Sequence, residues 1–395
     1  MLLGIDRRAM TALATGHLAV DFAAGAIPAL LPFFKDRFGL SYTLAAVIVL
    51  ASTVSSSVIQ PLFGLWSDRR GAIWLLSAGV AVAGVGIALA AAAPVYGLVV
   101  LCVVVSRLGT AAFHPEGSKF AAYASGEQRA SGMSLFSVGG NVGYALGALV
   151  TTPIVIALGL TGGLLLMIPG LVVAGMLLRL VPYLLALEPR EADPGAGGGS
   201  TERERPGAMV LLLAIVALRS VAWFGLLTFV PLWEVSLGNS KSYGAHLLSL
   251  MLVTGAIGTL LAGPAADRIG RRPVLLASNL VVPPAILVFV LVGGVPGALA
   301  LCVVGPAVVG TFGVTMVMSQ EYLPRHIGMA SGLSIGLSIG LGGIAAVMLG
   351  AIADSVDLRT ALYVCAAAPI FGAVLTLLLP SSRARRGLAP EMVPS

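Results

Sequence analysis

Charged residues are scarce in this chain. Asp, Glu, Lys and Arg make up only 10% of its 395 residues, whereas hydrophobic residues make up 58% and the mean hydropathy is +1.00. An average soluble domain carries about 25% charged residues, so this chain has too few to cover a surface that faces water. The scarcity excludes an ordinary soluble domain and favours a membrane protein.

Cysteines and enzyme motifs are scarce as well. Each of the three cysteines (Cys102, Cys302 and Cys365) lies in an apolar run, with no CxxC pair and no neighbouring histidine. We therefore expect packing residues, no disulfide framework and no metal site. The chain has no P-loop, nucleophile elbow, HExxH motif or dinucleotide fingerprint. These absences predict no enzyme and no cofactor.

Long apolar runs dominate what is present. Runs of about 20 apolar residues are typical of transmembrane helices, and no all-β alternation occurs. We predict an all-α polytopic membrane protein with twelve transmembrane helices in two six-helix, pseudo-symmetric bundles. The expected helices lie near residues 9–34, 43–66, 72–93, 96–122, 128–157, 161–187, 208–235, 242–266, 273–293, 296–322, 327–353 and 358–380.

Two polar segments punctuate the apolar runs. Residues 188–206 are rich in Gly, Glu and Arg, which predicts a flexible cytoplasmic linker between bundles at 1–187 and 207–380. Residues 381–395 form a basic tail that we expect to be cytoplasmic and disordered. The net charge of +6 resides in short loops, so it does not indicate nucleic acid binding.

The distribution of Lys and Arg predicts the orientation, because cytoplasmic loops of membrane proteins carry an excess of these residues. One side carries 16 of the 23 basic residues, the other side carries Lys35, Arg37, Lys241 and Arg359, and three lie within helices. This bias places both termini and the linker of the multi-pass chain in the cytoplasm. We expect a monomer in the bilayer.

The two halves of the sequence repeat. The run Gly64-Leu-Trp-Ser-Asp68-Arg69-Arg70-Gly71 matches residues 263–270 (GPAADRIG) at an offset of 199, and ASGMS at 130–134 matches ASGLS at 330–334 at an offset of 200. An even number of helices per half makes the halves parallel repeats. In such chains the substrate site lies between the halves near the membrane midplane.

Ionisable residues within the apolar runs mark the expected site. Charged groups persist in membrane helices mainly where they face the protein interior or a water-filled cavity. At a rise of 1.5 Å per residue, Asp21 lies roughly 17 Å from the cytoplasmic end of its helix and Arg107 roughly 15 Å from the outer end of its own. Both are therefore near the midplane, where an Asp21–Arg107 pair is geometrically plausible. His17 and His114 lie about one turn or more nearer the cytoplasm.

Glycines recur every four residues in two helices. They stand at 139, 143 and 147 and again at 328, 332, 336 and 340. This spacing lets helices pack or slide closely.

The duplicated G-x-x-x-D-R loop resembles the signature of the major facilitator superfamily over essentially the whole chain. Within it, the run from His17 to Pro32, Gln60-Pro-Leu-Phe-Gly64, Phe113-His114-Pro115-Glu116 and Gly139-Gly140-Asn141 are similar to the bacterial fosmidomycin-resistance exporters. The resemblance implies a proton-coupled antiporter that exports small anionic or amphiphilic molecules and lies in the bacterial cytoplasmic (inner) membrane. The Gly-Pro of the usual antiporter signature is missing from the fifth helix.

We assign expected roles on this basis. The proton-coupling candidates are Asp21, Glu116, His17 and His114. The substrate-binding candidates are Arg107, Arg219, His114 and Asn141, with the two arginines forming an anion clamp from the two halves. The gating candidates are Gly64, Asp68, Arg69, Arg70, Gly71, Asp267, Arg268 and Arg271.

Each assignment has a structural alternative. Asp21 and Arg107 could form a static bridge, Glu116 could be a helix-end carboxylate near Lys119, and the histidines could simply be hydrogen-bonded. Two alternative functions also stay open: a proton symporter that imports an organic anion, and a membrane sensor that transports nothing.

Overall fold

The computed structural model describes residues 4–70, 72–126, 129–187, 204–323 and 327–380. Over these residues the chain forms twelve α-helices and one short 3-10 turn, η1 (Gly163–Leu166). The helices are α1 (Arg7–Phe38), α2 (Tyr42–Arg70), α3 (Trp74–Ala92), α4 (Tyr96–Ala124), α5 (Arg129–Gly162), α6 (Met167–Leu185), α7 (Pro206–Ser236), α8 (Lys241–Ile269), α9 (Arg271–Leu291), α10 (Gly294–Tyr322), α11 (Ile327–Ser355) and α12 (Leu358–Leu378). The predicted all-α fold is confirmed.

Eleven stretches are long and apolar enough to span a membrane. One of them, Gly132–Leu185, is 54 residues long and contains most of α5 together with η1 and α6. Gly159 interrupts this stretch with a φ of 69°, a left-handed conformation that glycine adopts without steric cost. The stretch therefore holds two spans, and the total agrees with twelve transmembrane helices.

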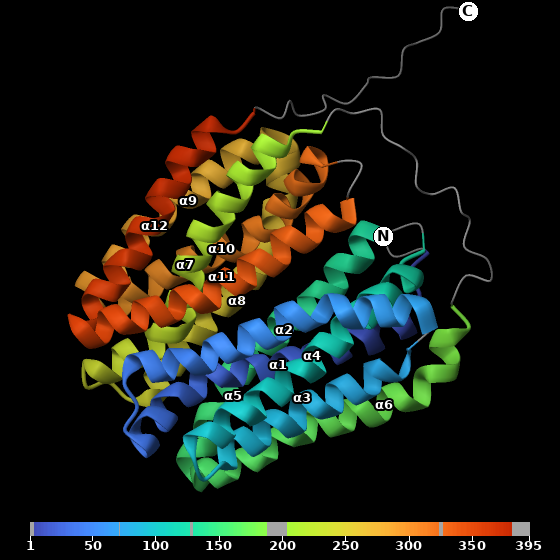
Figure 1. The fold of residues 1–395 in the computed structure, drawn as a ribbon, viewed down its shortest axis with the longest axis horizontal. Helices are drawn as coiled ribbons and strands as arrows, with labels where there is room; N and C mark the ends of the chain where they lie inside the picture. The colour runs from blue at the N-terminus through green and yellow to red at the C-terminus, as the bar shows by residue number, and fades with distance from the viewer. Residues whose placement is uncertain (1–3, 71, 127–128, 188–203, 324–326, 381–395) are drawn as a thin grey trace, which may run out of the picture.

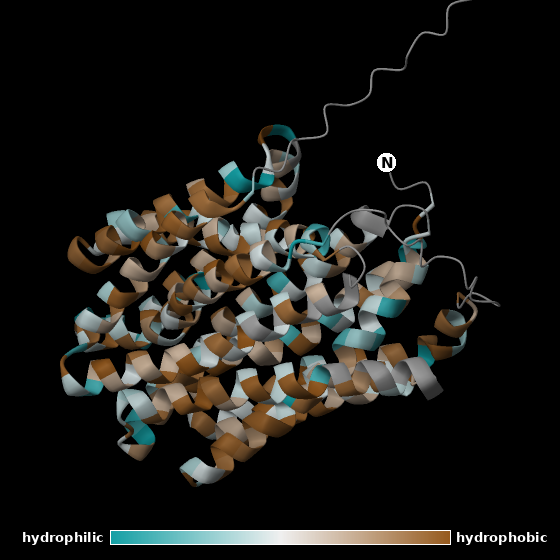
Figure 2. Ribbon diagram, turned by 45° about the horizontal axis from the view of Figure 1, so that its top comes forward, coloured by the Kyte–Doolittle hydropathy of each residue, from teal (hydrophilic) through white to brown (hydrophobic). Residues whose placement is uncertain are grey.

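The helices form two bundles that are consecutive in sequence (Figure 1). Helices α1–α6 make one bundle and α7–α12 the other, and the polar segment 188–203 lies outside the described residues, as does the tail 381–395. Helix α7 begins at Pro206, within the range we had expected for the linker. Apolar residues cover most of each helix and polar residues gather at the helix ends (Figure 2), as expected of a chain that is surrounded by lipid.

Contacts between the two bundles gather at the end away from the termini. The carboxylate of Asp354 near the end of α11 accepts hydrogen bonds from the backbone N–H groups of Tyr42 and Thr43, at 2.7 and 2.8 Å, and so caps α2. Lys241 at the start of α8 forms an ion pair with Asp36 near the end of α1. These contacts hold this end of the molecule closed.

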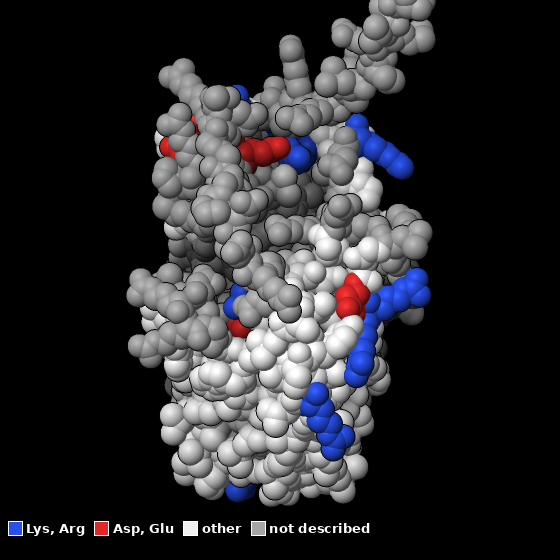
Figure 3. Space-filling model, turned by 90° about the vertical axis from the view of Figure 1, so that its right-hand side faces the viewer, with Lys and Arg blue, Asp and Glu red and all other residues white. Residues whose placement is uncertain are grey.

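The opposite end, which carries the termini, is where the two bundles separate. Figure 3 looks at this end and shows a recess between the two parts of the molecule, with both basic and acidic side chains on either side of it. The two bundles are therefore in contact at one end and separated by a recess at the other.

The first glycine stripe brings α5 onto the backbone of α1. A Cβ added to Gly139, Gly143 or Gly147 would lie 2.3, 2.1 or 2.1 Å from the carbonyl oxygen of Ala14, Leu18 or Phe22, respectively. These distances are far inside van der Waals contact, so the three positions accept only glycine without a backbone shift. The predicted close packing occurs here. In α11, by contrast, a Cβ at Gly336 or Gly340 would meet open space.

We expect Gly143→Ala to lower the free energy of unfolding by about 1–3 kcal/mol, because overpacking forces backbone and side chains apart. The matched control is Gly175→Ala in α6, where a Cβ meets nothing within 4 Å. There, alanine reduces the entropy of the unfolded chain and is expected to be neutral or stabilising by up to about 1 kcal/mol. Denaturant unfolding of both variants in detergent measures the difference, and equal effects would contradict the packing argument.

Candidate functional site

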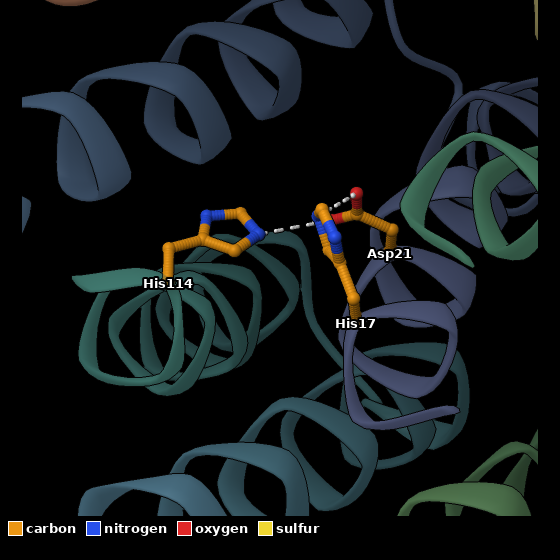
Figure 4. Close-up of side chains that lie close together, drawn as sticks. All are labelled: His17, Asp21 and His114. Atoms are coloured by element: carbon orange, nitrogen blue, oxygen red, sulfur yellow. Dashed lines mark ion pairs between the residues drawn. The ribbon is translucent and has the colours of Figure 1, made fainter. Parts of the chain in front are cut away.

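Three titratable side chains meet inside the first bundle (Figure 4). His17 and Asp21 lie one turn apart on α1, and His114 reaches them from α4. The Nε2 atom of His17 is 3.2 Å from Oδ2 of Asp21, and the Nε2 atom of His114 is 3.5 Å from Oδ1. One carboxylate therefore lies between two imidazole rings, and 13–22% of each side chain remains exposed.

The backbone of α5 fixes which nitrogen of His17 carries a hydrogen. Nδ1 of His17 lies 2.8 Å from the carbonyl oxygen of Phe136, which can only accept a hydrogen bond. Nδ1 must therefore be the donor, and Nε2 faces Asp21 either as a bare lone pair or, in the imidazolium, as a second N–H. The ring of Phe136 stacks on His17 with centroids 4.2 Å apart and holds its orientation.

Gly140 makes room for this cluster. A Cβ at this position would lie 2.4 Å from Nε2 of His17 and 2.7 Å from Oδ2 of Asp21. The glycine thus lets the backbone of α5 approach the two polar atoms directly. Its neighbour Asn141, predicted to bind substrate, is half-buried in α5.

Arg107 does not form the ion pair with Asp21 that the sequence made plausible. It donates from Nε to the backbone carbonyl of Ser52 on α2 at 3.4 Å and from Nη1 to Oγ1 of Thr110 at 3.3 Å. The reason is geometric: the two imidazoles already occupy both oxygens of the carboxylate.

Glu116 lies apart from the cluster. Its side chain is 1% exposed and forms an ion pair with Lys119 at 3.2 Å, one turn further along α4. The pairing with Lys119 is the one named in the structural alternative for Glu116, but the residue is buried within α4 rather than at the end of the helix.

A buried guanidinium occupies the second bundle. Arg219 on α7 is 4% exposed and donates to the hydroxyls of Thr311 and Thr315 on α10, at 2.8 and 3.4 Å. In the part of the chain that the structure describes, no carboxylate lies within ion-pair distance of it. A buried charge without a counterion is costly, so this position favours an anion.

Equivalent positions of the two bundles carry side chains of opposite charge. Asp21 lies fourteen residues after the start of α1, and Arg219 lies thirteen residues after the start of α7. Each projects toward the fourth helix of its own half, where Asp21 meets His114 and Arg219 meets two threonines. The repeat thus carries an acid with two bases on one side and a cation on the other.

The gating candidates are only partly described. Gly71 lies outside the described residues, and the surroundings of Gly64, Asp68, Arg69, Arg70 and Asp267 are likewise not described. Arg268 is exposed, and Arg271 forms an ion pair with Glu321 of α10 within its own bundle.

Several residues of the site had no signal in the sequence. The carbonyl of Phe136 and the hydroxyls of Thr311 and Thr315 act through long-range contacts that no local motif predicts. Gly140 was visible only as part of a glycine pair next to Asn141.

The cluster can hold a positively charged species between acceptors. His17 presents Nε2 and Asp21 presents a carboxylate, so a proton shared between them satisfies both atoms. The same three side chains, with donor atoms that all lie within 4.8 Å of one another, are also the described residues best arranged to hold a metal ion.

Comparison with known proteins agrees with this architecture. The chain is 32% identical over 384 residues to an uncharacterized MFS-type transporter, YfnC, of Bacillus subtilis (strain 168), which covers 94% of this chain and 92% of that protein. It is 29% identical over 382 residues to the fosmidomycin resistance protein of Escherichia coli (strain K12), with the same coverage of both chains.

Solved structures share the fold at low identity. A bacterial homologue of the human lysosomal transporter Spinster, in an inward-facing and occupied conformation, matches with a TM-score of 0.77 at 16% identity and covers 94% of this chain and 96% of its own. FucP in its outward conformation matches with a TM-score of 0.63 at 15% identity and covers 94% and 99%. The sequence model of the Major Facilitator Superfamily matches residues 13–247 and 212–393. The chain is therefore a multi-pass membrane protein that belongs to the major facilitator superfamily.

Proposed function

We propose that this protein is a proton-coupled antiporter that exports small anionic or amphiphilic compounds of the fosmidomycin type by alternating access. The observation that carries the proposal is the asymmetric pair of equivalent positions. A carboxylate between two imidazoles, His17 and His114, lies in one half, and the guanidinium of Arg219, for which the described residues offer no carboxylate, lies in the other. One half is suited to a proton and the other to an anion.

The open end fits the cargo-loading step of export. With the termini in the cytoplasm of a bacterial cell, as the Lys and Arg distribution predicts, the recess opens inward and the contacts of Asp354 and Lys241 close the outer end. Cargo would enter from the cytoplasm, and Arg219 together with Arg107 would attract its acidic group. This architecture needs no second subunit to complete the site, so we propose a monomer in the inner membrane.

Proton exchange at Asp21 would drive the return of the empty carrier. In the outward-facing state the Asp21 cluster takes up a proton as cargo leaves, and in the inward-facing state the proton passes to the cytoplasm as new cargo binds. Asp21 gives and takes this proton, and Nε2 of His17 shares it, because Nδ1 of that ring is committed to the Phe136 carbonyl. Rocking of the two bundles would alternate access to the cluster.

The names of the two relatives agree with different parts of this proposal. The relative from Escherichia coli is named for resistance to fosmidomycin, and the relative from Bacillus subtilis is named only as a transporter. A symporter that imports an organic anion would use the same fold with the proton moving in the same direction as the cargo. A sensor that transports nothing would not explain why Asp21 and Arg219 lie at equivalent positions within the two bundles.

The proposal is tested with purified protein in liposomes that contain a pH-sensitive dye. Fosmidomycin and a panel of small phosphonates and carboxylates are added outside, with protein-free liposomes as the control for passive leakage. We expect protons to move in the direction opposite to the cargo. Movement in the same direction would make the protein a symporter, and no cargo-dependent proton movement across the whole panel would remove the proposed function.

A further inference from the structure

In the His17–Asp21–His114 cluster, one ring nitrogen of each histidine faces an oxygen of the Asp21 carboxylate. The Phe136 carbonyl commits the hydrogen of a neutral His17 to Nδ1, which leaves a lone pair on Nε2 pointing at a carboxylate oxygen 3.2 Å away. The Nε2 atom of His114 is buried and makes no hydrogen bond, although it lies 3.5 Å from the other carboxylate oxygen. The lone pair of a neutral His17 and the carboxylate repel each other, so a proton or a metal ion between these atoms is favourable, and Nε2 of His114 faces the same carboxylate.

The distances between the histidine nitrogens and the carboxylate oxygens can be compared with those expected for a shared proton and for a metal ion. Hydrogen bonds between an imidazolium and a carboxylate are typically about 2.7–2.9 Å long. Neighbouring ligands of a tetrahedral zinc ion, each about 2.0–2.2 Å from the metal, lie roughly 3.3–3.6 Å apart. The observed separations, 3.2 Å from His17 to Oδ2 and 3.5 Å from His114 to Oδ1, are longer than two short hydrogen bonds, and one ligand atom from each of the three residues lies within 4.8 Å of the other two.

The surroundings are also those of a metal site. Metal-binding histidines usually donate their second ring N–H to a carbonyl or carboxylate, which fixes the ring, and His17 does so to Phe136. Gly140 keeps α5 clear of the ligand atoms, since a Cβ there would lie 2.4 Å from Nε2 of His17. The side chains are 13–22% exposed, so an ion can reach them.

We propose that Nε2 of His17, the carboxylate of Asp21 and Nε2 of His114 form a binding site for a borderline divalent cation such as Zn²⁺. Two neutral imidazoles and one carboxylate leave such an ion with open coordination positions for water or an acidic group of the cargo. The positive charge of Arg107 opposes cation binding, although its guanidinium is directed to Ser52 and Thr110. The site departs from our sequence-based expectation of no metal, which considered only the cysteines.

The site has a consequence for transport that rests on the proposed function. If Asp21 exchanges the coupling proton, bound Zn²⁺ occupies the same atoms and blocks that exchange. Zn²⁺ would then inhibit transport, and protons would compete with it because imidazole binds metal only when neutral.

Zn²⁺ binding is measured by isothermal titration calorimetry on the full-length protein in detergent, with no polyhistidine tag and no cargo present. We expect one ion per chain. The variants His17→Gln and His114→Gln should each weaken binding at least about tenfold, because loss of even a group that only orients a ligand costs about 10–100-fold. The matched control is His246→Gln, a replacement of an exposed histidine on α8, which should leave binding unchanged. Binding of the wild type should also weaken as the pH is lowered.

The proposal is overturned if the wild type binds no Zn²⁺, or if the two site variants bind it as the wild type does. Each variant is first checked by gel filtration, and His114→Gln keeps the His17–Phe136 contact that packs α1 on α5. The titration uses no gradient and no cargo, so its failure leaves proton coupling to be decided by the liposome experiment. Conversely, loss of the proposed transport would not affect a measured zinc affinity.

Discussion

Replacing Asp21 by asparagine is expected to abolish cargo-driven proton movement while leaving cargo exchange in place. Asparagine keeps the size and hydrogen-bonding shape of the side chain but cannot release a proton at any physiological pH. In dye-loaded liposomes the proton signal should therefore fall to that of protein-free liposomes. Exchange of labelled for unlabelled cargo, which needs no net proton transfer, should continue.

The matched comparison is Glu116→Gln, which alters a more deeply buried carboxylate on α4 of the same bundle. Because Glu116 is paired with Lys119 and lies apart from the histidines, we expect this variant to retain proton coupling. The opposite pattern, with coupling lost in Glu116→Gln and kept in Asp21→Asn, would move the proton to Glu116 and refute our assignment.

Replacing Arg219 by glutamine is expected to have the second largest effect, on cargo affinity. Loss of one partner of a buried charge pair costs about 2–5 kcal/mol, which corresponds to a decrease in affinity of roughly 30- to 5000-fold. The effect should be confined to anionic cargo, since neutral compounds do not use the guanidinium. Binding of a phosphonate to the purified protein, measured by calorimetry, tests this expectation.

Two further variants separate charge from structure. Arg219→Lys keeps the charge but loses the planar fork that binds two acceptors, so its affinity should lie between those of the wild type and the glutamine variant. Arg179→Gln replaces an exposed arginine of α6 and should bind as the wild type does. Unchanged affinity in Arg219→Gln would show that the residue only ties α7 to Thr311 and Thr315 on α10.

The sequence by itself determined the architecture. Twelve apolar runs and a repeat at offsets of 199 and 200 residues predict two parallel six-helix bundles, because lipid leaves helices or a closed barrel as the only spanning structures. The glycine spacing of α5 predicted close helix packing there, since only glycine allows such an approach. The same spacing in α11 does not produce close packing at Gly336 and Gly340. No other helix among the described residues lies against these two glycines, since a Cβ at either position would meet nothing within 4 Å.

Only the tertiary structure decided how the charges are paired. Depth along a helix placed Asp21 and Arg107 at a common level, but helix rotation and the intervening imidazoles direct the carboxylate to His17 and His114. The hydrogen position on His17 depends on the carbonyl of Phe136, 119 residues away in the chain, and no local pattern encodes it. Which end is closed depends on contacts such as Asp354 with the start of α2, which form between residues more than 300 positions apart.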